Sequence, residues 1–525
     1  MTAIDNTSNF DPISVEVWRH IFSAVAEEMG GTLERTSYSP NIKERRDYSC
    51  ALFDCKGELI AQAAHIPVHL GAMPVMMEAL FSSIKWQKGD VWICNDLKHG
   101  GTHLPDLTVI EPIYCSGDST PTGFAANRAH HADIGGMSPG SLPLSTEIFQ
   151  EGLIISPVRL VNGGRLNADI LQLICSNSRT PEERRGDLLA QLSANRVGVS
   201  SYLELIQNYG IDTIQERIDQ SKTYSSKLIK TALKSIEGVY LFRDAVESDG
   251  KGNEEIPICL TLTIKDGAAS FDFSGTSDQV SGSLNCSEAV TKSACYYAIR
   301  CLVREDIPMN SHTFRNISVF APKGSLVNCD SRCAVAAGNV ETSQRIVDVC
   351  LGALAQARPE LIPAASQGTM NNFLVGGFDP LRNQPFSYYE TICGGAGAAP
   401  GNDGASATQV HMTNTRNTPV EIFEMHYPLQ VMEYSIRPKQ CNGKWSGGSG
   451  VVRRVKLLTD CQVTVISERR RTSPYGLNGG GNGTKGKNTV TIAGLEEELP
   501  AKVSRRFPKG SVITIKTPGG GGHGA

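Results

Sequence analysis

The hydrophobic pattern of this chain of 525 residues changes near its middle. Before about residue 240, long stretches repeat apolar residues at helical spacing, most clearly in residues 15–29, 179–208 and 212–236. After that point, short apolar runs alternate with turn residues, a pattern that is typical of strands. The two patterns together predict an α+β fold of several domains, with mixed helices and largely antiparallel sheets.

A polar segment that contains glycine, residues 247–255, follows the change in pattern. Such a composition favours a connection between domains, and a chain of this length has room for roughly two to four domains of about 100–200 residues. We therefore expect an N-terminal region over residues 1–245, which carries the candidate metal site, and a β-rich C-terminal region over residues 246–525 with a glycine-rich tail.

Several shorter elements are predicted inside these regions. The first helix is expected to end at Gly30-Gly31, because adjacent glycines terminate helices. The other predicted elements are a hairpin over residues 50–61, a helix near 71–84, strands over 91–95 and 107–114, a β segment over 260–275 with its turn at Asp266-Gly267, and helices over 287–303 and 341–357.

Charge, cysteine usage and the length of apolar runs exclude several classes of protein. The formal net charge is -4, so no basic field marks a general nucleic-acid binder. No run reaches the roughly 18 apolar residues of a membrane-spanning helix, and the first residues lack the basic and apolar segments of a signal peptide. The 15 cysteines include no Cys-x-x-Cys pair, which indicates reduced thiols in a cytoplasmic protein.

Glycine is the residue type in clear excess, with 52 residues where an average protein has about 7%. The absence of a three-residue period excludes a collagen helix. Many glycines stand near the C-terminus, which ends in the sequence TPGGGGHGA over residues 517–525. From these residues alone, a flexible tail is the favoured interpretation.

Six of the 11 histidines fall between residues 65 and 131, far more than an even spread would place there. They are His65, His69, His99, His103, His130 and His131. Two segments combine histidine with aspartate, GGTHLPD over residues 100–106 and NRAHHADIGG over residues 127–136. Both adjoin apolar runs and contain adjacent glycines, which is typical of strand-end loops that carry site residues.

Imidazole and carboxylate ligands together suit a divalent ion such as Zn, Mn or Fe. We predict that His103, Asp106 and His130 bind such an ion, with Asp47 as a possible fourth ligand. His131 and Asp133 would orient the ligands or act as a general base. The ion would lower the pKa of a bound water and polarise a carbonyl oxygen. The alternative is that these histidines are hydrogen-bonding loop residues without a metal.

The segment NIKERRDYS, residues 41–49, gathers charged residues directly before an apolar strand. This arrangement can place Glu44, Arg45 and Asp47 at a site. A solvated turn at the protein surface is the alternative interpretation.

Two of the histidines, His65 and His69, stand four residues apart, as on one face of a helix. Pro67 between them argues against an intact helix at this point. A structural role and a site role are therefore equally favoured for this pair.

A match to the G-x-S-x-G pattern of serine hydrolases occurs over residues 136–140, but the residue after Ser138 is Pro139. The oxyanion hole of that class uses the backbone N–H at this position, and proline has none. A serine hydrolase is therefore excluded. No P-loop signature occurs, and the glycine-rich segment at residues 479–483 lacks the flanking strand and helix of a nucleotide-binding loop.

Several motifs, taken in order along the chain, resemble the hydantoinase B family. They are ERRDYSCALFD, HIPVHLGAM, GGTHLPD, HHADIGG, GNVETSQRI, GTMNN and PGGGGHG, and the resemblance extends over residues 11–525. The family includes B subunits of ATP-dependent hydantoinases, the C-terminal part of eukaryotic 5-oxoprolinases, caprolactamase subunits and related subunits of ketone carboxylases.

The resemblance implies a hetero-oligomer with a divalent metal in this chain. A hydantoinase A-like partner subunit of actin-like ATPase fold would bind ATP and phosphorylate the substrate oxygen. The metal, Zn or Mn above all, would be held by His103, Asp106 and a more distant histidine, for which we prefer His130 over His131. Asp47 is carried over as a further ligand. Positions that match the family and can line the same cavity are Asn339, Glu341, Thr342 and Asn371.

The implied function is hydrolysis of a small cyclic amide, a lactam or cyclic urea of the hydantoin, 5-oxoproline or caprolactam type (EC 3.5.2). Metal-activated water would attack the phosphorylated carbonyl, with Glu44, His131 and Asp133 as catalytic groups. Two alternatives stay open, a subunit of an ATP-dependent ketone carboxylase and a scaffold subunit without catalysis. A PGGGG-type ending belongs to the family pattern, so an ordered tail near the cavity or the partner interface is as well supported as a flexible one.

Overall fold

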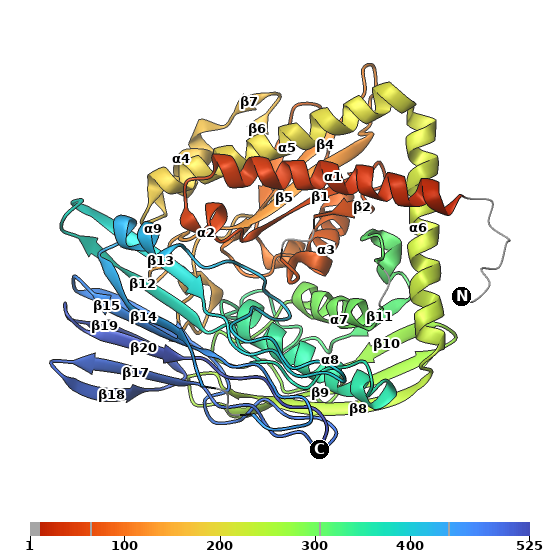
Figure 1. The fold of residues 1–525 in the computed structure, drawn as a ribbon. Helices are drawn as coiled ribbons and strands as arrows, with labels where there is room; N and C mark the ends of the chain where they lie inside the picture. Colours follow the sequence, from red (N-terminus) through yellow and green to blue (C-terminus); the bar gives the residue numbers. More distant parts are fainter. Residues whose placement is uncertain (1–10, 64–65, 304–305, 439–440) are drawn as a thin grey trace.

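The computed structural model describes residues 11–63, 66–303, 306–438 and 441–525 (Figure 1). Its strands form four sheets, in which nearly all neighbouring strands are antiparallel, and helices cover two of these sheets. The predicted α+β class is therefore confirmed. No helix of the described part is both long and apolar enough to span a membrane. All fifteen cysteines are free thiols.

The first sheet has seven strands in the order β2-β1-β5-β4-β3-β6-β7. Residues on β1 alternate between two cores: Leu52 faces the core of α1 and α5, whereas Phe53 faces the core of α3. Helices thus cover both faces of the sheet (Figure 1). The elements of this part are α1 (Pro12–Thr36), α2 (Pro40–Lys43), β1 (Tyr48–Asp54), β2 (Leu59–Gln62), α3 (His69–Phe81), β3 (Val91–Cys94), η1 (Leu97–His99), β4 (Asp106–Ile113), β5 (Gly123–His130), η2 (Ile148–Gln150), β6 (Val158–Asn162), β7 (Arg165–Leu166), α4 (Ala168–Ser176), α5 (Pro181–Tyr209) and α6 (Ile211–Lys234).

The predicted hairpin over residues 50–61 is confirmed as β1 and β2, but the predicted end of the first helix is wrong. Helix α1 continues through Gly30-Gly31 to Thr36. Leu33, beyond the glycines, is fully buried in the core shared with α5. Because a glycine inside a helix costs only about 1 kcal/mol, burial of one further leucine is enough to continue the helix.

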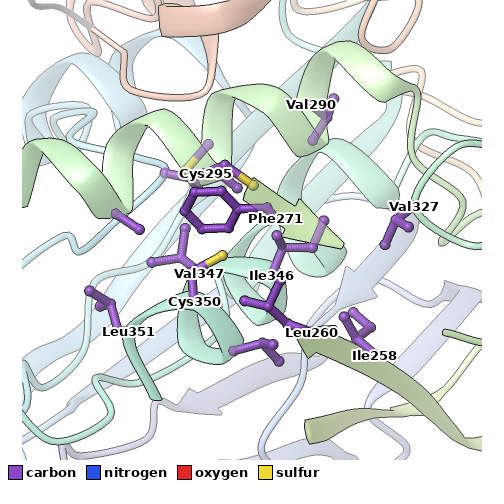
Figure 2. Packing of buried hydrophobic residues seen from close by; sticks show 14 of the residues in the cluster. Ile258, Leu260, Phe271, Val290, Cys295, Val327, Ile346, Val347, Cys350 and Leu351 are labelled. Carbon is purple, nitrogen blue, oxygen red and sulfur yellow. The ribbon is translucent and has the colours of Figure 1, made fainter. Parts of the chain in front are cut away.

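A second sheet, in the order β11-β10-β9-β8, is covered by α7 and α8. Figure 2 shows Phe271 of β10 between Cys295 of α7 and Val347 of α8. The elements are β8 (Gly238–Ser248), β9 (Glu254–Lys265), β10 (Ala268–Asp272), α7 (Glu288–Leu302), η3 (Ser311–Phe314), β11 (Ile317–Phe320), η4 (Gly338–Thr342) and α8 (Ser343–Ala357).

The polar segment at residues 247–255 is the turn of the hairpin formed by β8 and β9. Residues 245 and 246, on either side of the expected boundary, both lie within β8. The change in sequence pattern near residue 240 therefore corresponds to the passage from α6 into this sheet, and polar turn residues stand where a linker was expected.

Two more sheets pack face to face, with a core that draws on both. Their strand orders are β13-β12-β16-β19 and β14-β15-β20-β17-β18. The elements are β12 (Asn372–Asp379), β13 (Gln384–Thr391), α9 (Val420–His426), β14 (Leu429–Ile436), β15 (Val451–Leu457), β16 (Cys461–Ile466), β17 (Lys487–Ile492), β18 (Leu495–Leu499), β19 (Lys502–Phe507) and β20 (Val512–Lys516).

The glycine-rich C-terminus is part of the folded core, so the prediction of a flexible tail is wrong. Residues 517–523 are buried. The N–H groups of Gly520, Gly521 and Gly522 donate to the carbonyl oxygens of Gly448, Ala365 and Gly481 at 2.9, 2.8 and 2.8 Å. Glycine at these positions lets backbone segments lie directly against one another.

Glu111 on β4 provides a test of how burial affects stability. Burial raises the pKa of this carboxyl to about 7, and the charge of Arg196 offsets only part of the effect. The unfolded chain therefore loses this proton near pH 4.5 while the folded chain keeps it to about pH 7, so stability falls across that interval, by at most about 3 kcal/mol. We expect Glu111→Gln, which stays neutral, to unfold at a higher temperature than the wild type at pH 8 and at a similar temperature near pH 4.5. Glu204→Gln at an exposed position of α5 is the control, and a Glu111→Gln gain that is the same at both pH values would contradict the assignment.

Candidate metal centre

The antiparallel pairing of β4 and β5 creates the centre of the site. Asp106, the first residue of β4, lies opposite His130, the last residue of β5. The turn before β4 brings His103 to the same point, since the N–H of Asp106 donates to the carbonyl oxygen of His103 at 3.2 Å. All three side chains are almost completely buried.

Three donor atoms converge in this cluster. The Oδ1 of Asp106 lies 3.1 Å from Nε2 of His103 and 3.3 Å from Nδ1 of His130, and the two nitrogens are 3.1 Å apart. An ion bound at about 2.0–2.2 Å from each donor separates its ligands by roughly 3.0–3.5 Å. The spacing of these atoms therefore fits a single small divalent ion.

The hydrogen bonds around the cluster leave lone pairs directed at its centre. The carbonyl oxygen of Ala336 lies 3.3 Å from Nδ1 of His103; because a carbonyl only accepts, Nδ1 carries the proton and Nε2 offers a lone pair. Asp106 Oδ1 and His130 Nε2 have no hydrogen-bond partner among the described residues. Buried polar atoms without partners are expensive unless a ligand satisfies them.

Electrostatic coupling inside the cluster is strong. Burial disfavours an ionised Asp106, but the charges of His103 and His69 outweigh it and hold the pKa of Asp106 well below its usual range. Burial likewise disfavours a charged His103, but Asp106 raises the pKa of that imidazole. For His130, burial dominates and lowers the pKa. An ionised carboxylate beside a neutral imidazole is the donor set that a divalent ion requires.

Neighbouring side chains fix the carboxylate of Asp106 from behind. Its Oδ2 accepts a hydrogen bond from the Thr102 hydroxyl at 2.5 Å and one from the Asn339 amide at 3.4 Å. His69 Nε2 lies 3.3 Å from the same oxygen, and His69 Nδ1 lies 3.0 Å from the Ser49 hydroxyl. The structure thus gives His69 a place at the site, whereas His65 lies outside the described residues.

The cavity at the cluster is small, with a volume of about 20 Å³. A space of this size holds one ion or one water molecule. Asp47, His69 and Asn339 contribute polar groups to its lining, and Val68, Met370 and Met412 contribute apolar ones. Of the later residues expected at the cavity, Asn339 lines it, whereas Glu341, Thr342 and Asn371 lie outside its lining.

Three residues predicted to be catalytic do not line this cavity. His131 follows the end of β5 and points away from His130, with Nε2 2.9 Å from the Gln191 amide oxygen; burial lowers its pKa to about 3. Asp133 forms an ion pair with Arg179 at 3.0 Å and accepts backbone hydrogen bonds. Glu44 is half-buried at the end of α2. The geometry therefore gives all three a position beside the site and not in it.

Tyr389 is a site residue that the sequence did not indicate. It comes from β13, and its ring stacks on the imidazole of His130 with centroids 5.0 Å apart. The guanidinium of Arg45 lies 4.7 Å from the centroid of the same ring. A tyrosine on a distant strand carries no local pattern, so only the folded structure could reveal it.

Comparisons with known proteins agree on one family. Residues 11–525 match a family model described as hydantoinase B/oxoprolinase. The chain is 39% identical to 5-oxoprolinase 1 of Arabidopsis thaliana over 98% of its own length, but spans only 42% of that protein. It is 31% identical to the B component of a putative D-/L-hydantoinase from a Pseudomonas species, covering 98% of this chain and 90% of that one. The crystal structure of an ATP-dependent caprolactamase from Pseudomonas jessenii matches with a TM-score of 0.90 and 27% identity, over 98% of this chain and 92% of that chain.

Proposed function

This chain belongs to the hydantoinase B/oxoprolinase family, and from that premise we propose that it is the hydrolytic subunit of an ATP-dependent cyclic amidase. Its substrate is a lactam or a cyclic urea. The observation that carries the proposal is the buried cluster of His103, Asp106 and His130, in a fold similar to that of an ATP-dependent caprolactamase.

The proposal divides the reaction between two subunits. An amide carbonyl is a poor electrophile, and transfer of a phosphoryl group to its oxygen turns that oxygen into a leaving group. We assign ATP binding and this transfer to a hydantoinase A-like partner, since a similar protein is named as one component of a hydantoinase and the similar 5-oxoprolinase is more than twice as long as this chain. Ring opening is assigned to this chain.

The donor set fits a divalent ion, for which we propose Zn or Mn. His103, Asp106 and His130 would hold the ion, and Asp47 on the cavity wall is the proposed fourth ligand. When bound, such an ion supplies a water ligand of lowered pKa and polarises a carbonyl oxygen. His69 and Asn339 hold the carboxylate of Asp106 in position, and Tyr389 holds the ring of His130. Val68, Met370 and Met412 keep bulk water out of the cavity.

The test is turnover by the purified complex of this chain with its ATPase partner. We expect ATP-dependent opening of at least one ring among hydantoin, N-methylhydantoin, 5-oxoproline and caprolactam, with ADP formed, in buffer free of bicarbonate. A reaction that instead needs bicarbonate and a ketone would make the complex a carboxylase. Full turnover with metal-free protein would make this chain a scaffold.

A further inference from the structure

A second, larger recess lies next to the metal cavity. It is a surface cleft of about 570 Å³, within the range of about 300–1,000 Å³ that small-molecule sites occupy. Thr391 lines the cavity, Thr415 lines the cleft, and their hydroxyl oxygens are 2.7 Å apart. Thr413 of the cavity lies 3.3 Å from the same Thr415 oxygen. A single layer of threonine side chains therefore separates the two spaces.

Arg45 is buried behind this layer without an anionic partner. The guanidinium donates to the hydroxyls of Thr391 and Thr415 at 3.0 and 3.3 Å, to the carbonyl oxygen of Tyr389 at 3.0 Å and to the side chain of Asn41. Its exposed fraction is 0%, and no carboxylate forms an ion pair with it in the described part of the chain. Buried charges are normally paired, since an unpaired charge is costly to remove from water.

The cleft itself carries positive charge and no negative charge. Arg416 lines it, and in the described ranges no ion pair involves the Arg416 guanidinium. The N–H of Arg416 donates to the carbonyl oxygen of Arg45 at 3.0 Å, which joins the two residues. No aspartate or glutamate lines the cleft. The nearest carboxylate contact is that of Glu390 with Asn417 at 3.4 Å, and Glu390 is already paired with Arg453 at 3.1 Å.

We propose that Arg45, Arg416 and Thr415 form a binding site for an anionic group of the substrate, a phosphoryl group or a carboxylate. An anion seated against the Thr415 hydroxyl would receive hydrogen bonds from neutral side chains and lie between two unpaired guanidinium groups. The cleft has room for a small ring, which the metal cavity has not. This inference rests on the proposed function for the identity of the substrate, but the anion site can be tested without turnover.

The experiment is calorimetric titration of the isolated, metal-depleted full chain with inorganic phosphate, 5-oxoproline or uncharged 2-pyrrolidinone. We expect phosphate or 5-oxoproline to bind and 2-pyrrolidinone not to bind. Binding of phosphate assigns the site to the phosphoryl group, and binding of 5-oxoproline alone assigns it to a ring carboxylate. Binding of neither anion, or equal binding of the uncharged ring, would overturn the inference.

Matched variants locate the site. Arg416→Gln at the cleft surface is expected to weaken anion binding about 10- to 100-fold, the effect of one charge-assisted hydrogen bond. Arg454→Gln, which removes an exposed arginine of β15, leaves binding unchanged. Thr415→Val keeps the shape of the buried layer and weakens binding without changing metal content. Equal affinities in all three variants would reject the site, whereas an inactive complex whose isolated chain still binds the anion would reject only the proposed function.

Discussion

Replacing Asp106 with asparagine is expected to remove the metal and to lower the rate of ATP-dependent ring opening by about 10³-fold or more. Asparagine keeps the size of the side chain and can keep its contacts with Thr102 and Asn339. It removes the negative charge that lies against both His103 and His69. Loss of a partner behind a ligand already costs 10- to 100-fold in metal affinity, so we expect loss of this central ligand to cost more than about 100-fold.

Elemental analysis of the purified variant, together with turnover by the complex, measures both effects. Asp90→Asn is a matched control, because Asp90 is equally buried but pairs with Arg159 at 2.7 Å and does not line the cavity. The control is expected to retain its metal. If Asp106→Asn retained full metal content and full activity, the assignment of the metal centre would be refuted.

The metal cluster lies within the reach of sequence reasoning because it depends on local structure. His103 and Asp106 stand three apart at the start of a strand, and His130 ends the next strand. The alternation of side chains along a strand also separates His130 from His131, which lies against Gln191. Pairing of the two strands then places Asp106 opposite His130.

The remainder of the site depends on contacts between distant segments, which no local pattern encodes. Tyr389 reaches His130 from the pair of packed sheets, and Thr415 reaches Arg45 from a loop after β13. The charged segment before β1 was interpreted as either a turn or a site. Its outcome is mixed: Asp47 lines the cavity, Arg45 is buried behind it and Glu44 stays at its edge.

The C-terminal glycines misled sequence reasoning for a different reason. A run of glycines has high conformational entropy in the unfolded chain, and it forms a stable structure only where other backbone segments surround it. Those segments come from residues 394–397, 447–450 and 476–483. Each of them is itself rich in glycine, so the excess of glycine in the composition is explained by contact between backbones in one part of the fold.

Replacing Gly520 with alanine is expected to destabilise the protein by more than about 3 kcal/mol. An added Cβ would lie 1.9 Å from the carbonyl oxygen of Ala396 and 2.3 Å from its carbon. Both are backbone atoms, which cannot move aside as the end of a side chain can. The N–H of Gly520 is meanwhile fixed to the carbonyl oxygen of Gly448 at 2.9 Å. The variant should unfold at a clearly lower temperature or fail to accumulate as soluble protein.

Gly31→Ala in helix α1 is the matched control, because the same atom is added in open surroundings. Its Cβ would meet only the flexible end of Arg35, at 3.3 Å. Alanine is also favoured over glycine inside a helix by about 1 kcal/mol, so this variant should be as stable as the wild type or slightly more stable. Gly520 is not among the glycines with positive φ, so lack of space is the whole reason for the expected loss. Equal unfolding temperatures for the two variants would therefore mean that the C-terminal segment is not packed between the other glycine segments.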